Sequence, residues 1–183
     1  SQLSPLISRF SGVSGFLQAE SSYTATGETV EEMLNSLSGN SAFSVTDSSV
    51  DIGVIKQVFT AIAALSPNGE AIQQWPDVIR FGDMSGYLIL EDGLNSQQEI
   101  RLRMDNFDIS GSGRIDPDAQ TFDYDLLFTV LGAPYTQTIP INELYHNVPW
   151  PVDCSAAFSD DVSRYCRADF TRVRDIFSQI GSN

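Results

Sequence analysis

The hydrophobic pattern divides the chain into a mainly helical part followed by a mainly β part. Apolar residues recur at helical spacing from Thr29 to Leu37 and again from Gly53 to Leu65. Between these segments, residues 42–47 alternate apolar and polar positions and predict a strand. From Val78 onward the apolar period changes from 3.6 to 2 residues, which indicates a run of strands.

The first helix is expected to begin with a capping box. In the motif Thr29-x-x-Glu32, the threonine hydroxyl can accept from the Glu32 amide, and the Glu32 carboxylate can reach back to the N-cap. The apolar positions that follow share one helical face: Val30, Met33, Leu34 and Leu37. The pattern therefore predicts a short amphipathic helix.

Alternating segments after residue 78 predict consecutive antiparallel strands. One turn is expected at Asp105-Asn106, because apolar residues occupy even-numbered positions before it and odd-numbered positions after it. A second turn is expected at Asp116-Pro117-Asp118-Ala119. Strands joined by short turns form a meander with one wet and one apolar face. We therefore expect an α+β fold: a curved antiparallel β-meander with amphipathic helices packed on its apolar face.

The C-terminal part departs from this alternation. A proline-rich stretch runs from Pro140 to Pro151, and helical spacing returns from Arg167 to Gly181. We expect residues 1–183 to form a single domain, because 183 residues suit one hydrophobic core. Within it, residues 1–20 are expected to be an N-terminal extension. Residues 143–183 are expected to comprise a proline-rich loop, a cysteine pair and a C-terminal helix.

Charge and composition remove several function classes. The chain has 10 Lys and Arg residues against 24 Asp and Glu residues, a net charge of −14 that repels phosphate backbones, so we expect no nucleic-acid partner. The single histidine, His146, rules out a His-rich metal site. No stretch approaches the ~18 apolar residues of a membrane span. The start at Ser1, without an initiator methionine, suggests a longer precursor.

Reactive constellations in the sequence are weak. Asp123 and Asp125 lie two apart on one strand face, a spacing that a glycosidase could use, although a solvated sheet face is the simpler interpretation. The segment from Asp108 mimics a calcium loop but has Ala119 at the position of the bidentate glutamate. The sequence lacks the Gly-x-Ser-x-Gly motif of a serine hydrolase with which His146 could act, so His146 is interpreted as a surface-loop histidine. We therefore expect no enzyme activity, no cofactor and no metal.

Cys154 and Cys166 are the only cysteines. They could be two buried thiols, a disulfide or half of a metal site, but no further cysteine or nearby histidine completes a zinc site. In an oxidising compartment the disulfide is favoured, and it would close a short loop worth roughly 2–3 kcal/mol.

The apolar side of the expected sheet is the remaining candidate for function. It could be a closed core, or a groove left open for acyl chains or a partner strand. The candidate lipid-lining residues are Leu102, Met104, Phe107, Ile109, Tyr124, Leu126 and Phe128. Alternatively, an edge strand or the proline-rich loop contacts another protein. Tyr145, Trp150 and Pro151 would then be anchors, because aromatic residues dominate interface hot spots.

The order of several motifs resembles the AsmA family of envelope proteins. Residues 24–39 are similar to that family's block of an extended strand, a glycine, a short helix and Leu-x-Gly. Phe107-Asp108-Ile109-Ser110-Gly111-Ser112-Gly113-Arg114-Ile115-Asp116 is similar to its recurrent Gly-x-Gly-x-Ile/Val-Asp strand. Three further segments resemble the family's elements in the same order: 43–52, 122–126 and 138–141. The resemblance covers about residues 20–142 and leaves out the cysteine pair.

The resemblance implies a C-terminal periplasmic domain of a longer Gram-negative protein that is anchored in the inner membrane. The AsmA family is associated with outer-membrane biogenesis and lipid homeostasis, and its larger members are described as grooved β-structures that conduct phospholipid. No catalytic residues are assigned to the family. The resemblance thus implies a non-enzymatic module whose partners are lipid acyl chains or envelope proteins. A periplasmic location would also favour the Cys154–Cys166 disulfide.

Overall fold

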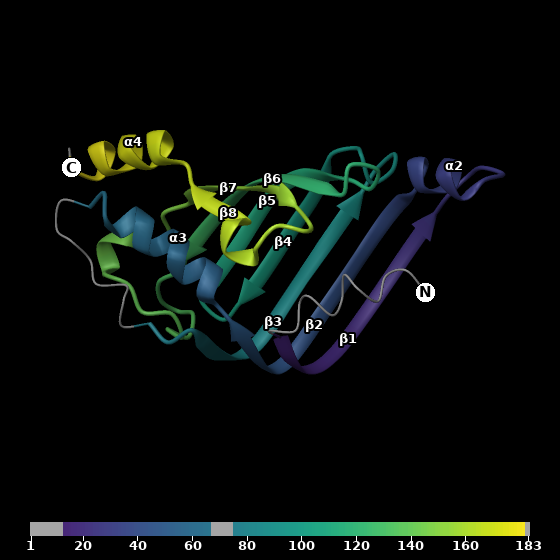
Figure 1. Ribbon diagram of the computed structural model, residues 1–183. Helices are drawn as coiled ribbons and strands as arrows, with labels where there is room; N and C mark the ends of the chain where they lie inside the picture. Colours follow the sequence, from purple (N-terminus) through teal and green to yellow (C-terminus); the bar gives the residue numbers. More distant parts are fainter. Residues whose placement is uncertain (1–12, 67–74, 182–183) are drawn as a thin grey trace.

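The computed structural model describes residues 13–66 and 75–181 (Figure 1). Its main element is an eight-stranded antiparallel sheet whose strands lie side by side in sequence order. The strands are β1 (Val13–Thr24), β2 (Ser38–Asp51), β3 (Val78–Leu90), β4 (Gln98–Met104), β5 (Phe107–Asp116), β6 (Thr121–Val130), β7 (Trp150–Ala157) and β8 (Cys166–Ala168). The antiparallel meander expected from the alternating segments is therefore confirmed.

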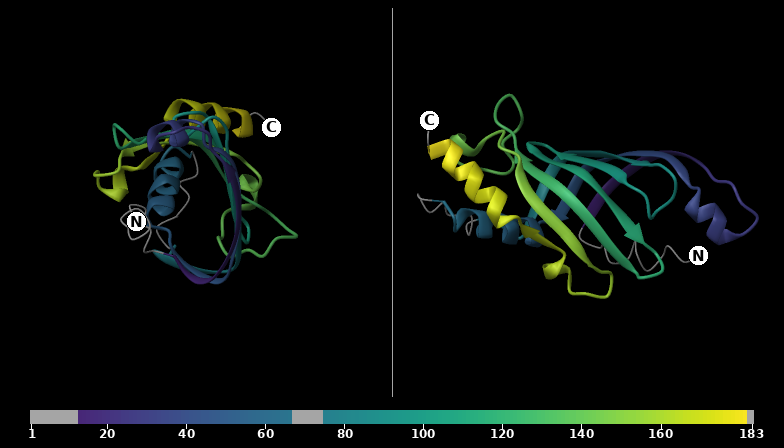
Figure 2. Two further views of the ribbon diagram at one scale, coloured as in Figure 1. Left: turned by 90° about the vertical axis from the view of Figure 1, so that its right-hand side faces the viewer. Right: turned by 90° about the horizontal axis from the view of Figure 1, so that it is seen from above.

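In the described part of the chain, three α-helices accompany the sheet, which makes the fold α+β. They are α2 (Val30–Asn35), α3 (Gly53–Ala63) and α4 (Phe170–Gly181), with short 3-10 helices η2 (Glu143–Tyr145) and η3 (Val162–Arg164). The left view of Figure 2 shows the strands following an arc, with α3 on the concave side. Within the described residues, every helix is too short or too polar to cross a membrane.

Several boundaries differ from those expected. Residues 13–20, expected to be an extension, form most of β1, and residues 1–12 lie outside the described part. Strand β2 spans 14 residues rather than the expected 42–47, because its pairing with β1 and β3 carries polar positions into the sheet. Helix α4 begins at Phe170 instead of Arg167, since Cys166–Ala168 pair with β7.

Strands β2 and β3 bend together at Asp47. The pairing skips Asp47 and Gly82, and Asp47 has a φ of 51°, in the left-handed region. Asp105, in the turn between β4 and β5, accepts hydrogen bonds from the N–H groups of Gly82 and Asp83, both at 3.1 Å. One carboxylate therefore satisfies two backbone donors beside the bend, which an unpaired ladder would otherwise leave open.

The core lies between the concave face of the sheet and α3. Phe59 of α3 reaches across, with its ring centre 6.0 Å from that of Phe107 and 6.4 Å from that of Phe128. The Phe59 ring also lies 5.4 Å from Trp75. Each fully buried phenylalanine contributes about 1.5–3 kcal/mol. This aromatic cluster therefore fixes α3 against β5 and β6.

Candidate functional site

The pairing of the strands determines which side chains share the concave face, because directly opposite residues point to the same side. One row crosses the sheet through Leu102, paired with Ile109, and the next through Ile100, paired with Gly111. Six apolar side chains in these two rows are only partly buried, and we call them the open strip: Phe43, Leu88, Ile100, Leu102, Ile109 and Leu126. The strip lies beside the part of the concave face that α3 covers.

The seven lipid-lining residues expected from the sequence do not form one accessible surface. Met104, Phe107 and Phe128 are 1%, 0% and 3% exposed. The expectation that these three line an open surface is therefore wrong, because α3 and its neighbours cover both the Met104–Phe107 row and the end of the Leu102 row at Phe128, and make them core. The remaining apolar residues, Leu102, Ile109 and Leu126, belong to the open strip.

Tyr124, the seventh expected lining residue, lies at one end of the strip and is partly buried. Its hydroxyl donates to Oε1 of the buried Gln98 at 2.8 Å, and Nε2 of Gln98 donates to the carbonyl of Leu94 at 2.8 Å. Burial raises the pKa of Tyr124. The polar end of this tyrosine is thus satisfied by the protein, and its ring continues the apolar lining.

Three members of the open strip were not expected from the sequence: Phe43, Leu88 and Ile100. Leu88 and Ile100 lie in alternating segments, so their parity was a usable signal. Phe43 also lies in an alternating segment, and the register of β2 against β3 places it opposite Gly86. A Cβ at Gly86 would lie 2.7 Å from the Phe43 ring. Because Gly86 has no side chain, the Phe43 ring can pack directly against the backbone of the sheet at this position.

The expected interaction anchors are buried. Tyr145 and Trp150 are 5% and 1% exposed, and Pro151 is buried in β7. The Trp150 ring lies 6.1 Å from Tyr145 and 5.1 Å from Phe177 of α4. In this folded state the expectation that the three form a contact surface is therefore wrong, because Phe177 of α4 packs on Tyr145 and Trp150 and because Pro151 is a buried residue of β7.

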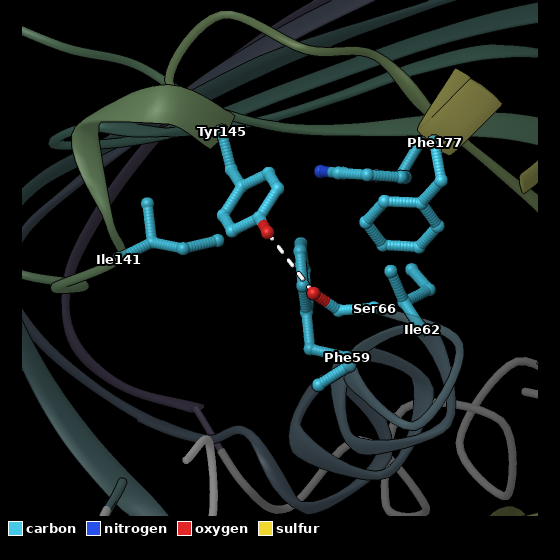
Figure 3. Close-up of a pocket in the computed structure, with 8 residues that line it drawn as sticks. Phe59, Ile62, Ser66, Ile141, Tyr145 and Phe177 are labelled. Carbon is cyan, nitrogen blue, oxygen red and sulfur yellow. Dashed lines mark hydrogen bonds between the residues drawn. The ribbon is translucent and has the colours of Figure 1, made fainter. Parts of the chain in front are cut away.

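A small void lies beside these aromatic residues (Figure 3). The hydroxyls of Ser66 and Tyr145 are hydrogen-bonded across it at 3.0 Å. Its volume of about 10 Å³ is no larger than a single water requires. It is a packing defect of the core and offers no room for a ligand.

Cys154 and Cys166 form the expected disulfide. They are paired residues of β7 and β8, with sulfurs 2.07 Å apart. Beside them, the Phe122 ring lies 4.9 Å from that of Tyr165, whose hydroxyl donates to the carbonyl of Phe158 at 2.9 Å. The disulfide therefore closes a compact loop that ends with the short strand β8.

Among the candidate reactive residues, Asp125 and Asp108 are engaged in ion pairs. Asp125 forms an ion pair with Arg172 of α4 at 3.2 Å, while Asp123 is exposed. Asp108 lies 3.0 Å from Arg103 and 3.4 Å from Arg101 on the convex face. Over residues 13–66 and 75–181, no three His, Cys, Asp or Glu side chains are grouped so that they could hold a metal ion.

Asp153, on the convex face, is a carboxyl group whose ionised form is disfavoured by its surroundings. Partial burial raises the pKa of Asp153, and the nearby carboxylates Asp169 and Asp125 raise it further. Arg167 and Arg172 oppose the effect but do not cancel it. Asp125, Asp153 and Arg167 are paired across strands β6 to β8 on the opposite face of the sheet from the open strip, whereas Asp169 follows β8 and Arg172 lies in α4.

No protein-family model, curated protein or solved structure matches this chain in comparisons with known proteins. In the described residues, the geometry offers partly exposed apolar side chains on the concave side and ion pairs on the convex side. The concave arrangement suits contact with apolar matter, because burying such side chains releases water from their surface.

Proposed function

We propose that this chain is a non-enzymatic periplasmic module of an AsmA-like protein that acts in outer-membrane biogenesis and in lipid transport or homeostasis. In this proposal the full-length protein is anchored in the inner membrane. Amphipathic helices pack on the apolar face of the curved sheet and leave the open strip for acyl chains. The observation that carries the proposal is the open strip itself, six partly exposed apolar side chains on a concave face.

The dimensions of the open strip suit an acyl chain. The strip crosses the five strands from β2 to β6. Four spacings of about 4.8 Å give a length of roughly 19 Å. One leaflet of a bilayer core is roughly 15 Å deep, half of about 30 Å. One extended acyl chain could therefore lie across the strip and bury apolar area worth roughly 25 cal/mol per Å².

Two further observations support the envelope context. The Cys154–Cys166 disulfide is a bond of the kind that persists in oxidising compartments, of which the bacterial periplasm is one. The motif order between about residues 20 and 142 resembles the AsmA family. Neither observation names a lipid, so the proposal extends to acyl chains and not to a particular headgroup.

The test is lipid binding by the purified chain, measured by native mass spectrometry after incubation with phosphatidylethanolamine vesicles. We expect bound phospholipid on the wild type and a roughly fivefold or larger loss in Leu102→Gln, which places an amide in the strip. The matched control is Leu144→Gln, because Leu144 is exposed and lies outside the strip. Circular dichroism confirms that both variants remain folded.

A second measurement keeps the test decisive if Leu102→Gln unfolds. A photo-crosslinking residue at Leu88, in the strip, should capture phospholipid, whereas the same residue at exposed Tyr135 should not. Absence of bound lipid on the folded wild type, or equal capture at both positions, would contradict the proposal.

A protein–protein interaction or scaffold role in the cell envelope is the second candidate function. It is favoured by the exposed edge of the sheet, where Phe16 and Leu17 of β1 are 77% and 66% exposed. The charged substitution Leu17→Lys should remove a protein contact there without changing lipid binding, because Leu17 is not part of the open strip. Loss of phospholipid in that variant would argue against two separate surfaces.

A further inference from the structure

We infer that the outer edge of β1 binds an extended, basic segment of another polypeptide as an additional strand of the sheet. Among the described residues, β1 pairs with β2 alone and forms one end of the eight-stranded order. Alternate residues of this twelve-residue strand therefore present unpaired N–H and C=O groups to the outer side, which is the template that a β-strand completes.

The edge lacks the features that usually block strand addition. Proteins protect exposed edges with proline, lysine, bulges or very short strands. Strand β1 contains no proline or lysine, and its single charge is Glu20. Its one irregularity is near the start, between Ser14 and Phe16, which leaves the rest of the strand in regular register. By contrast, the opposite edge strand β8 has only three residues.

The apolar pattern of the sheet continues to this edge and stops there. Leu17 pairs with Val45, and Val45 pairs with Met84, so the three share one row of the concave face. Val45 and Met84 are both 5% exposed, whereas Leu17 at the end of the row is 66% exposed. A neighbouring strand with an apolar side chain opposite Leu17 would extend the buried row by one position.

The negative charge of residues 13–51, which contain β1, α2 and β2, indicates which kind of segment binds at this edge. Residues 13–51 contain six carboxylates and no lysine, arginine or histidine: Glu20, Glu28, Glu31, Glu32, Asp47 and Asp51. A second copy of the chain would bring two such segments together at a net charge of −14 per molecule. Repulsion between the negative charges of two adjacent copies opposes their association, whereas a basic segment is attracted to them. The charge therefore favours a basic partner over self-association.

The experiment uses a synthetic peptide about as long as β1, with alternating valine and threonine and with lysine at some threonine positions. We expect fluorescence anisotropy to show binding and hydrogen exchange to show new protection confined to residues 13–24. The matched peptide with glutamate in place of lysine should bind at least roughly tenfold more weakly. Salt should weaken the binding of the lysine peptide.

Two variants of equal charge change locate the contact. Leu17→Lys should weaken binding of the lysine peptide roughly tenfold. Val30→Lys should change it much less, because Val30 is 74% exposed but lies on α2 and not on the edge. Both positions are exposed, so neither substitution should unfold the sheet.

Several outcomes would overturn the inference. These are no binding of the lysine peptide to the folded chain, equal affinity for both peptides, or protection outside β1. Concentration-dependent dimerisation that protects residues 13–24 without peptide would assign the edge to a second copy instead. Because none of these readouts involves lipid, failure here leaves the lipid proposal intact, and failure of lipid binding leaves this inference intact.

Discussion

The side chain of Asn106 and the backbone of Ile139 form two reciprocal hydrogen bonds. Nδ2 of Asn106 donates to the Ile139 carbonyl at 2.8 Å, and the Ile139 N–H donates to Oδ1 at 2.9 Å. Both residues are 0% exposed. The asparagine amide therefore makes the two hydrogen bonds with Ile139 that a neighbouring strand would make in a sheet. These bonds join the β4–β5 turn to the segment before η2.

Removing this amide should be costly. In Asn106→Ala the Ile139 N–H and carbonyl remain buried without these partners, so we expect the free energy of unfolding to fall by about 2–4 kcal/mol. Urea unfolding followed by tryptophan fluorescence measures the change. Asn95→Ala, at an exposed turn position, is the control and should change it by less than about 0.5 kcal/mol. Equal effects of the two substitutions would refute the role of the paired bonds.

Met104 and Leu102 should respond differently to truncation although they are two residues apart on the same face. Met104 is core beneath α3, so Met104→Ala should cost about 2–5 kcal/mol. Leu102 is partly exposed in the open strip, so we expect Leu102→Ala to cost about half as much. Thermal unfolding of both variants gives the comparison. A larger loss for Leu102 would mean that the open strip is packed more deeply than the partial exposure of Leu102 indicates.

The Cys154–Cys166 disulfide should stabilise the fold by restricting the unfolded chain. The two cysteines are 12 residues apart, so replacing both with alanine should lower the free energy of unfolding by about 2–3 kcal/mol. Reductant should lower the unfolding midpoint of the wild type and leave that of the double variant unchanged. An identical response to reductant in both proteins would show that the bond does not form in solution.

Ionisation of Asp153 should destabilise the native state. Its pKa is raised above the ordinary value of 3.8, so the folded state binds this proton more tightly than the unfolded state does. The associated stability is present below pH 3.8 and is lost as the pH rises through the raised native pKa. Asp153→Asn should therefore unfold at a higher temperature than the wild type at pH 7.

The difference between these two proteins should shrink as the pH falls toward 3.8, because Asp153 is then protonated in the wild type. Differential scanning calorimetry at several pH values measures it. Asp123→Asn, on the same strand face as Asp125, is the control for loss of one negative charge at an exposed site. A pH-independent difference would assign the effect to packing rather than to ionisation.

Features that depend on neighbouring residues in the chain were predictable from the sequence. The Thr29–Glu32 capping box is confirmed, with Glu32 N–H donating to Thr29 Oγ1 at 3.1 Å. The turn after Asp116 is confirmed as well, since that carboxylate accepts from the N–H groups of Asp118 and Ala119. Such short-range hydrogen bonds are specified by residue type and spacing alone.

Features that depend on distant packing were not predictable in the same way. The proline-rich pattern predicts a loop over Pro140–Pro151, yet Trp150 and Pro151 begin β7 and pair with β6. Pro151 is tolerated because β8 pairs with β7 only from Val152 onward, so the missing N–H is not needed there. Burial of Met104 likewise depends on where α3 lies, and no alternation pattern carries that information.

Because each strand of the sheet pairs with the strand that precedes it in the chain, the architecture can be assembled by accretion. During synthesis, which begins at the N-terminus, each new strand can pair with the strand made just before it and does not depend on a strand far along the chain. Short-range order of this kind speeds folding relative to topologies that join distant segments. It also means that lengthening the array by whole hairpins would disturb only the junction at which they are inserted.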